Sequence, residues 1–169
     1  MIIGLIADTQ GRFDVDALLA YVAQEFEAVD EIWHAGDWGQ DAVLDGLRRL
    51  KPLVVVNGNA PDDPRCPLTV QRPIGRWQVG MIHNLAHAAP EWTAHLDVVI
   101  HAHSHRWRDE LAGRIRFLNP GTATRPQFGG TERTIARLHV GERIEVEKVF
   151  VPRLPEDLPS PSGRGRGGV

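Results

Sequence analysis

The chain has 169 residues, the size of a single domain, and a formal net charge of −3 at pH 7. Its one cysteine, Cys66, excludes an internal disulfide framework and a cysteine-rich zinc site. The acidic balance gives no support to a protein that coats nucleic acid. The sequence shows neither a secretory signal nor an apolar run of transmembrane length. We therefore expect a cytoplasmic protein without a membrane partner and without a stable nucleic-acid complex.

The first third of the chain alternates predicted strands with predicted helices. Apolar runs at residues 2–7, 31–35 and 53–56 indicate buried strands. Apolar side chains recur at helical spacing over residues 14–26 and 40–50, and Asp14 is a suitable N-cap for the first of these helices. This β-α-β-α-β order is typical of a parallel sheet with right-handed crossovers.

The remaining two thirds of the chain predict antiparallel or mixed strand pairing and one short helix. We therefore expect an α/β fold, a layered sandwich, over residues 1–152. Residues 153–169 are rich in Pro, Ser, Gly and Arg, and we expect them to form a disordered tail. The predicted strands are 68–72, 76–82, 97–102, 107–111, 114–118, 132–140 and 142–151, and the short helix is 90–95.

Five of the predicted strands are followed by side chains that can bind a metal. In open α/β sheets the ligand site lies outside the carboxyl ends of the strands. Each Asp or Asn alone is explained as an ordinary loop residue or helix cap, but the whole set suits a pair of divalent metals such as Mn, Fe or Zn. Such a pair, about 3.5–4 Å apart, hydrolyses phosphate esters. The set comprises Asp8, Asp37, Asn59, His83, His103 and His105.

In this order the motifs resemble those of the calcineurin-like metallophosphoesterases, in particular the small bacterial and archaeal phosphodiesterases. The resemblance covers residues 1 to about 150 and implies an αββα sandwich of two mixed sheets. It also implies hydrolysis of phosphate esters by metal-bound hydroxide at a dinuclear site, with phosphodiesters preferred over monoesters. The motifs are Asp8-x-Gln10, Gly36-Asp37, Gly58-Asn59, His83, Ala102-His103-Ser104-His105 and Asn119-Pro120-Gly121-Thr122.

The resemblance assigns a role to each matched residue. Asp37 would bridge the metals and Asn59 would also position the phosphate, so both count as catalytic. Two divalent ions are implied, Mn²⁺ first, with Fe, Zn, Ni or Mg as alternatives. The substrate would be a small phosphoester, nucleotide-like among the options, and a homo-oligomer remains open. Asp8, Gln10 and His105 would hold the first metal, and Asn59, His83 and His103 the second.

The sequence departs from the family pattern at three positions, and two of them, Gln10 and Ala60, motivate a second hypothesis. Gln10 replaces a histidine and is a poorer ligand for late first-row metals. Ala60 replaces the Cys or His of relatives and cannot protonate a leaving group. Ala102 replaces a glycine, at little cost if its φ is negative. The alternative function is thus a catalytically impaired protein of this fold that acts as a binding or scaffold module.

Several further side chains keep two interpretations each. Arg12 follows the first metal loop and would contact the phosphate or stay solvated. Arg125 has the same two interpretations, a phosphate contact or a solvated side chain. Trp38 would stack on an aromatic substrate group or pack in the core. His34 is expected to hydrogen-bond near the site instead of binding metal, and His101 is expected to be structural.

Overall fold

The computed structural model describes residues 1–155, so most of the expected tail, residues 156–169, lies outside the described residues. Fourteen helices and strands are present in the described part. The strands are β1 (Ile2–Ile6), β2 (Glu31–His34), β3 (Leu53–Val55), β4 (Thr69–Ile74), β5 (Trp77–Ile82), β6 (Val98–Ile100), β7 (Trp107–Ala112), β8 (Ile115–Pro120), β9 (Thr134–Val140) and β10 (Ile144–Phe150). The helices are α1 (Val15–Glu25), α2 (Asp41–Leu50), the 3₁₀ helix η1 (Leu85–His87) and α3 (Pro90–Thr93).

Two five-stranded mixed sheets form the centre of the molecule. The first has the order β10-β9-β1-β2-β3, with β1, β2 and β3 parallel and β9 antiparallel to β1. The second has the order β4-β5-β6-β8-β7, with β5, β6 and β8 parallel and the two edge strands antiparallel. The predicted α/β sandwich with mixed sheets is confirmed, as is the parallel β-α-β-α-β start.

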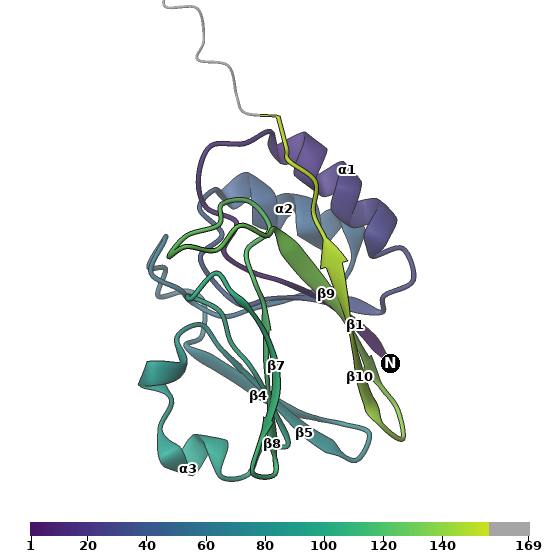
Figure 1. The fold of residues 1–169 in the computed structure, drawn as a ribbon, viewed down its shortest axis with the longest axis vertical. Coiled ribbons are helices and arrows are strands. Elements are labelled where there is room, and N and C mark those ends of the chain that lie inside the picture. Colours follow the sequence, from purple (N-terminus) through teal and green to yellow (C-terminus); the bar gives the residue numbers. More distant parts are fainter. Residues whose placement is uncertain (156–169) are drawn as a thin grey trace, which may run out of the picture.

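The two sheets pack through the side chains that alternate strand positions direct inward. One apolar cluster joins them, and it includes Leu5, Trp33, Met81, Ile100 and Leu138. A second cluster joins the first sheet to α1 and α2. Figure 1 shows these two helices together at one end of the molecule, while α3 lies at the other end beside the second sheet. The layered arrangement therefore leaves the strand ends and their loops open along one margin.

Local signals explain where the first helix begins and which face it buries. The carboxylate of Asp14 accepts a hydrogen bond from the backbone N–H of Ala17 at 3.0 Å, which caps α1. Leu18 and Val22, four residues apart, are the buried positions of the helix. The helix is therefore confirmed, with its N-cap at the predicted residue.

Two details differ from the sequence predictions. Pro73, expected in a connection between strands, lies within β4 opposite Gln78. An edge strand tolerates a proline because its outward N–H needs no ladder partner, and the turn is made instead at Gly75, whose φ is +58°. Beyond the predicted boundary at residue 152, Leu154 is buried and the carbonyl of Pro155 accepts from Asp14 N at 2.8 Å. The packed unit thus continues to residue 155.

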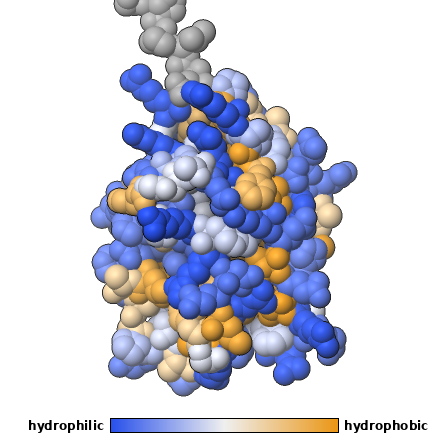
Figure 2. All heavy atoms as spheres, viewed as in Figure 1, coloured by the Kyte–Doolittle hydropathy of each residue, from blue (hydrophilic) through white to orange (hydrophobic). Residues whose placement is uncertain are grey.

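The surface is mixed in hydropathy on the face that Figure 2 shows, with hydrophilic side chains prominent over its upper part. Within residues 1–155, no helix has both the length and the apolar character needed to cross a membrane.

Candidate metal centre

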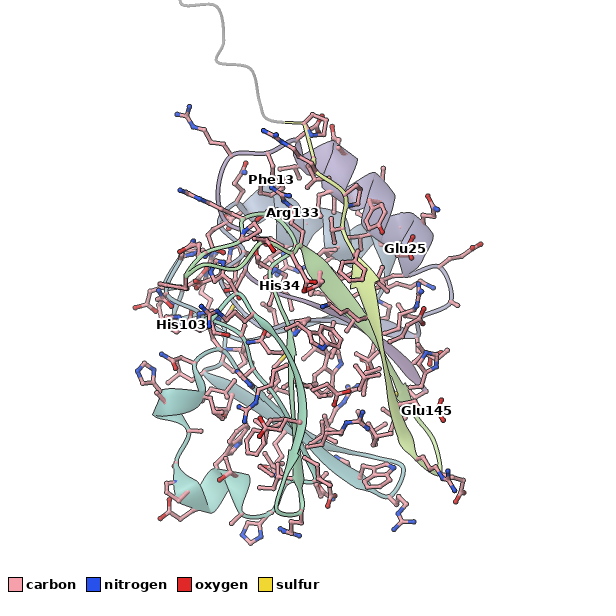
Figure 3. The ribbon with its side chains drawn as sticks, viewed as in Figure 1. Phe13, Glu25, His34, His103, Arg133 and Glu145 are labelled. Atoms are coloured by element: carbon pink, nitrogen blue, oxygen red, sulfur yellow. The ribbon has the colours of Figure 1, made fainter. Side chains whose placement is uncertain are left out.

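The predicted ligands gather where loops from both sheets meet. Asp8 follows β1, Asp37 follows β2 and Asn59 follows β3, while His83 follows β5 and the segment from His103 follows β6. Backbone hydrogen bonds join the first two loops, because Asp8 N donates to Gly36 O at 3.1 Å and Thr9 N donates to Asp37 O at 2.8 Å. Figure 3 shows His103 in the region where loops of the second sheet approach loops of the first sheet.

Four of the predicted ligands have left-handed backbone conformations. The φ angles are 50° at Asp8, 58° at Asp37, 71° at His103 and 56° at His105. Such angles are uncommon for residues other than glycine and persist only where the surrounding structure enforces them. Because strain of this kind clusters at functional sites, its recurrence at four neighbouring loop positions indicates a preorganised site. Ala102 has no positive φ, which explains why alanine fits there in place of glycine.

One group of ligand atoms comes from Asp37, His83 and His103, and these atoms lie within 4.8 Å of one another. His83 Nε2 is 3.3 Å from Asp37 Oδ1 and 3.3 Å from His103 Nδ1. The carbonyl of Ala35 accepts from His83 Nδ1 at 2.8 Å, so in neutral His83 the lone pair is on Nε2 and faces the group. In this tautomer no proton of His83 lies between its Nε2 atom and Asp37 Oδ1, and a cation would satisfy both atoms.

A second group surrounds Asp8. Its Oδ1 atom is buried without a hydrogen-bond partner, while Oδ2 accepts from His103 N at 3.2 Å. His105 Nε2 lies 3.6 Å from the unpartnered oxygen. The carbonyl of Arg125 accepts from His105 Nδ1 at 2.8 Å, so the Nε2 lone pair of the neutral ring also faces inward. A buried carboxylate oxygen without a donor is costly, and a metal ion would supply the missing partner.

Gln10 lies between the two groups. In the amide orientation that suits its neighbours, its nitrogen donates to the backbone oxygens of Asp37 at 3.0 Å and of Asp8 at 3.3 Å. Its Oε1 atom then lies 3.1 Å from His105 Nε2. This amide oxygen and the imidazole lone pair repel each other unless a cation or a proton lies between them. The glutamine therefore fits a metal through its oxygen, in the place where relatives have histidine.

Asn59 contributes to the centre through its backbone. Asn59 N donates to Asp37 Oδ1 at 2.7 Å and Ala60 N donates to the same oxygen at 2.9 Å. The Asn59 side chain is exposed and lines a pocket of about 370 Å³ together with His83. The structure thus brings Asp8, Gln10, Asp37, His83, His103 and His105 together and leaves the Asn59 side chain at the edge.

Burial and mutual charge shift the pKa values of the central residues. Burial raises the pKa of Asp8 to about 8, although His83 opposes this change, and the nearby Asp37 adds to it. The pKa of Asp37 is also raised by burial, but hydrogen bonding to His83 in its protonated form and hydrogen bonds from Asn59 N and Ala60 N outweigh this effect and lower the pKa overall. Asp37 is therefore held ionised by the protein, whereas at Asp8 the charge of His83 does not offset the effect of burial.

Other polar side chains that the sequence singled out lie outside the centre. His34 is buried, accepts from Gly36 N at 3.2 Å through Nδ1 and contacts Thr9 Oγ1 at 2.9 Å through Nε2, so it supports the loops without reaching the ligands. His101 is buried beside Asn119 and Arg108. Both expectations are confirmed.

Trp38 packs in the core, where its Nε1 donates to Asp41 Oδ1 at 3.3 Å. The core interpretation is therefore the correct one. Arg12 and Arg125 are exposed and line a common pocket beside Gln10.

Threonines that sequence reasoning missed hold the first loop in place. Thr122 Oγ1 donates to Asp8 O at 2.7 Å, and Thr124 Oγ1 donates to Gln10 O at 2.8 Å. The motif Asn119-Pro120-Gly121-Thr122 gave a signal for the first threonine. No sequence pattern points to Thr124, because an isolated threonine in a loop is common.

Comparison with known proteins places this geometry in a family. The model of the calcineurin-like phosphoesterase superfamily domain matches residues 1–143. A probable metallophosphoesterase of Methanocaldococcus jannaschii is 30% identical over 160 residues, which cover 88% of this chain and 81% of the relative.

Solved structures share the fold at lower identity. An archaeal phosphodiesterase has a TM-score of 0.73 at 21% identity, with 89% of this chain and 100% of that one covered. The zinc complex of Vps29 from Entamoeba histolytica has a TM-score of 0.69 at 19% identity, with 89% and 99% covered. The family model and the archaeal relative, together with the fold, show that this chain belongs to the calcineurin-like phosphoesterase superfamily, in its branch of small metallophosphoesterases.

Proposed function

We propose that the protein is a metal-dependent phosphoester hydrolase with a dinuclear site and a preference for phosphodiesters. The observation that carries the proposal is a cluster of possible ligand atoms, from Asp37, His83 and His103 within 4.8 Å of one another, together with the buried, unpartnered Asp8 Oδ1 that faces His105. Family membership agrees with this activity.

The ligand types suit two divalent first-row ions, for which we propose Mn²⁺ first and Fe, Zn, Ni or Mg as alternatives. Asp8, Gln10 and His105 would hold one ion, His83, His103 and the Asn59 side chain the other, and Asp37 would lie between them. When bound, the ions would polarise the phosphoryl oxygens and lower the pKa of an attacking water.

The protein's own groups orient the reaction. Asn59 N and Ala60 N fix Asp37 Oδ1 at 2.7 and 2.9 Å, so the bridging carboxylate cannot rotate freely. Ala60 has no side-chain proton to give, which favours esters whose leaving group departs without protonation by the protein. Asn59, exposed at the edge of the centre, would donate its amide N–H to a phosphoryl oxygen.

Two pockets that border the centre support the proposed preference for diesters. One pocket, of about 370 Å³, includes Asn59, His83 and the apolar side chains of Leu68 and Trp92. The other, of about 350 Å³, begins at Gln10. A phosphorus atom at the centre therefore has room for a substituent in each direction.

Steady-state hydrolysis of bis(p-nitrophenyl) phosphate and p-nitrophenyl phosphate with Mn²⁺ tests the proposal, together with metal analysis of protein purified without chelator. We expect about two metal ions per chain, faster turnover of the diester, and a loss of at least about 100-fold in Asp37→Asn. Asp45→Asn, an exposed carboxylate on α2, is the matched control. Equal rates for wild type and Asp37→Asn would refute the proposal.

A binding or scaffold module is the second candidate. It is favoured by Gln10, whose amide nitrogen is satisfied by backbone oxygens of Asp8 and Asp37, so the loop keeps its structure without a metal. One ion or none per chain, with no turnover of either ester, would favour this function over hydrolysis.

A further inference from the structure

A basic pocket borders the metal centre on the side of Gln10. It has a volume of about 350 Å³, and four arginines line it together with Gln10 and Thr124. None of the described residues around it is acidic. Figure 3 places Arg133 and Phe13, two of its lining residues, close together above His34 and His103. The arginines are Arg12, Arg125, Arg133 and Arg153.

Hydrogen bonds join this pocket to the predicted metal ligands. The carbonyl of Arg125 accepts from His105 Nδ1 at 2.8 Å, and Thr124 Oγ1 donates to Gln10 O at 2.8 Å. Arg133 Nε donates to the carbonyl of Thr124 at 2.6 Å. The Arg125 side chain also lies against the backbone of Gly11, 3.7 Å from where a Cβ would stand. The pocket and the centre therefore share one rigid framework.

Three of the pocket's arginines have no carboxylate partner within the described part of the chain. The protein as a whole has a net charge of −3. Among the described residues, six arginines elsewhere pair with carboxylates, for example Arg116 with Asp109 at 2.7 Å and Arg137 with Glu25 at 3.1 Å. Within residues 1–155, Arg12, Arg125 and Arg133 form no such pair. Guanidinium groups gathered without carboxylates are the usual recognition elements for phosphate.

We propose that this basic pocket binds a second phosphate group of the substrate. The favoured substrates are then small phosphodiesters that carry an additional phosphate next to the scissile one. The inference rests on the proposed function, because it takes the metal centre as the place of hydrolysis. A volume of about 350 Å³ is that of a small-molecule site, whereas proteins that track a nucleic-acid strand use an extended positive groove.

A pair of dinucleotides that differ in one phosphate gives a direct test. Thymidylyl-thymidine has the scissile diester alone, and its 5′-phosphorylated form adds one terminal phosphate. We expect kcat/KM for the phosphorylated form to exceed that for the other by at least about tenfold in wild type. The double variant Arg12→Gln/Arg125→Gln should lose this preference. Arg133 is left intact because it supports Thr124.

The matched control removes the same charge elsewhere, in Arg49→Gln/Arg143→Gln, whose arginines are exposed and do not line the pocket. The control should keep the preference. Equal kcat/KM for the two dinucleotides in wild type, or an unchanged preference in the pocket variant, would overturn the proposal.

Calorimetric titration with inorganic tripolyphosphate in the presence of EDTA tests the pocket apart from hydrolysis. Wild type and control should bind it, and the pocket variant should bind at least about tenfold more weakly. Loss of all esterase activity with retained binding would contradict the proposed function but not the anion site. Absent or equal binding in all three proteins would overturn the anion site itself.

Discussion

Gly58→Ala is expected to displace the carboxylate of Asp37 without replacing any predicted ligand residue. A Cβ on Gly58 would lie 2.3 Å from Asp37 Oδ1 and 2.5 Å from Asp37 N. Carbon and oxygen atoms in close contact stay about 3.3 Å apart, so the carboxylate would have to move by roughly 1 Å. The same oxygen accepts from Asn59 N and Ala60 N, and both hydrogen bonds would be distorted.

A misplacement of about 1 Å costs on the order of 100-fold in rate, and forcing an extra carbon into a packed site costs about 1–3 kcal/mol of stability. The assay is hydrolysis of bis(p-nitrophenyl) phosphate with Mn²⁺, paired with metal content and urea unfolding. Gly141→Ala is the control, because its Cβ would meet one atom, Arg143 O, at 3.9 Å. Wild-type turnover and metal content in Gly58→Ala would refute the view that this close packing holds the carboxylate.

Three further changes probe the fold. Leu138→Ala, in the cluster between the sheets, should lower the free energy of unfolding by about 2–5 kcal/mol in urea titrations, and the exposed Leu111→Ala should change it little. Asp14→Ala removes the cap of α1 and should cost about 1 kcal/mol by the same measurement; an unchanged midpoint would contradict the capping role. Burial lowers the pKa of His34 to about 3, so protonation favours the unfolded chain, whose histidine titrates near 6.5. Stability should therefore fall as the pH drops from about 6.5 toward 3, by up to about 1.4 kcal/mol per unit, and His34→Gln in EDTA should show a shallower slope.

The sequence predicted the fold well where periodicity and strand ends carry the information. Helical spacing located α1 and α2, and the polar residues after apolar runs located the loops that bear Asp8, Asp37 and His83. The order of strands in each sheet was not predictable, because β9 joins β1 through pairs such as Leu5 with Ala136, far apart in the chain. Long-range pairing of this kind leaves no local pattern.

Parts of the candidate site were equally hidden in the sequence. The left-handed φ angles at Asp8 and His105 arise from tertiary contacts, since neither neighbouring sequence demands them. Thr124 and Arg133 are ordinary loop residues until the fold joins them to Gln10 and to each other. The basic pocket is therefore visible only in the structure, although the sequence indicates Arg12 and Arg125 singly as candidate phosphate contacts.

The position of β1 has a consequence for biosynthesis. This strand is central in the first sheet, with β2 on one side and β9 on the other. A ribosome synthesises β2 soon after β1, but β9 begins only at Thr134. Throughout that interval one edge of the nascent Ile2–Ile6 strand has no partner in its own chain, and such an edge is open to pairing with other chains. Strand β1 thus completes its hydrogen bonding long after it is made, and the growing polypeptide has most need of chaperone protection before β9 emerges.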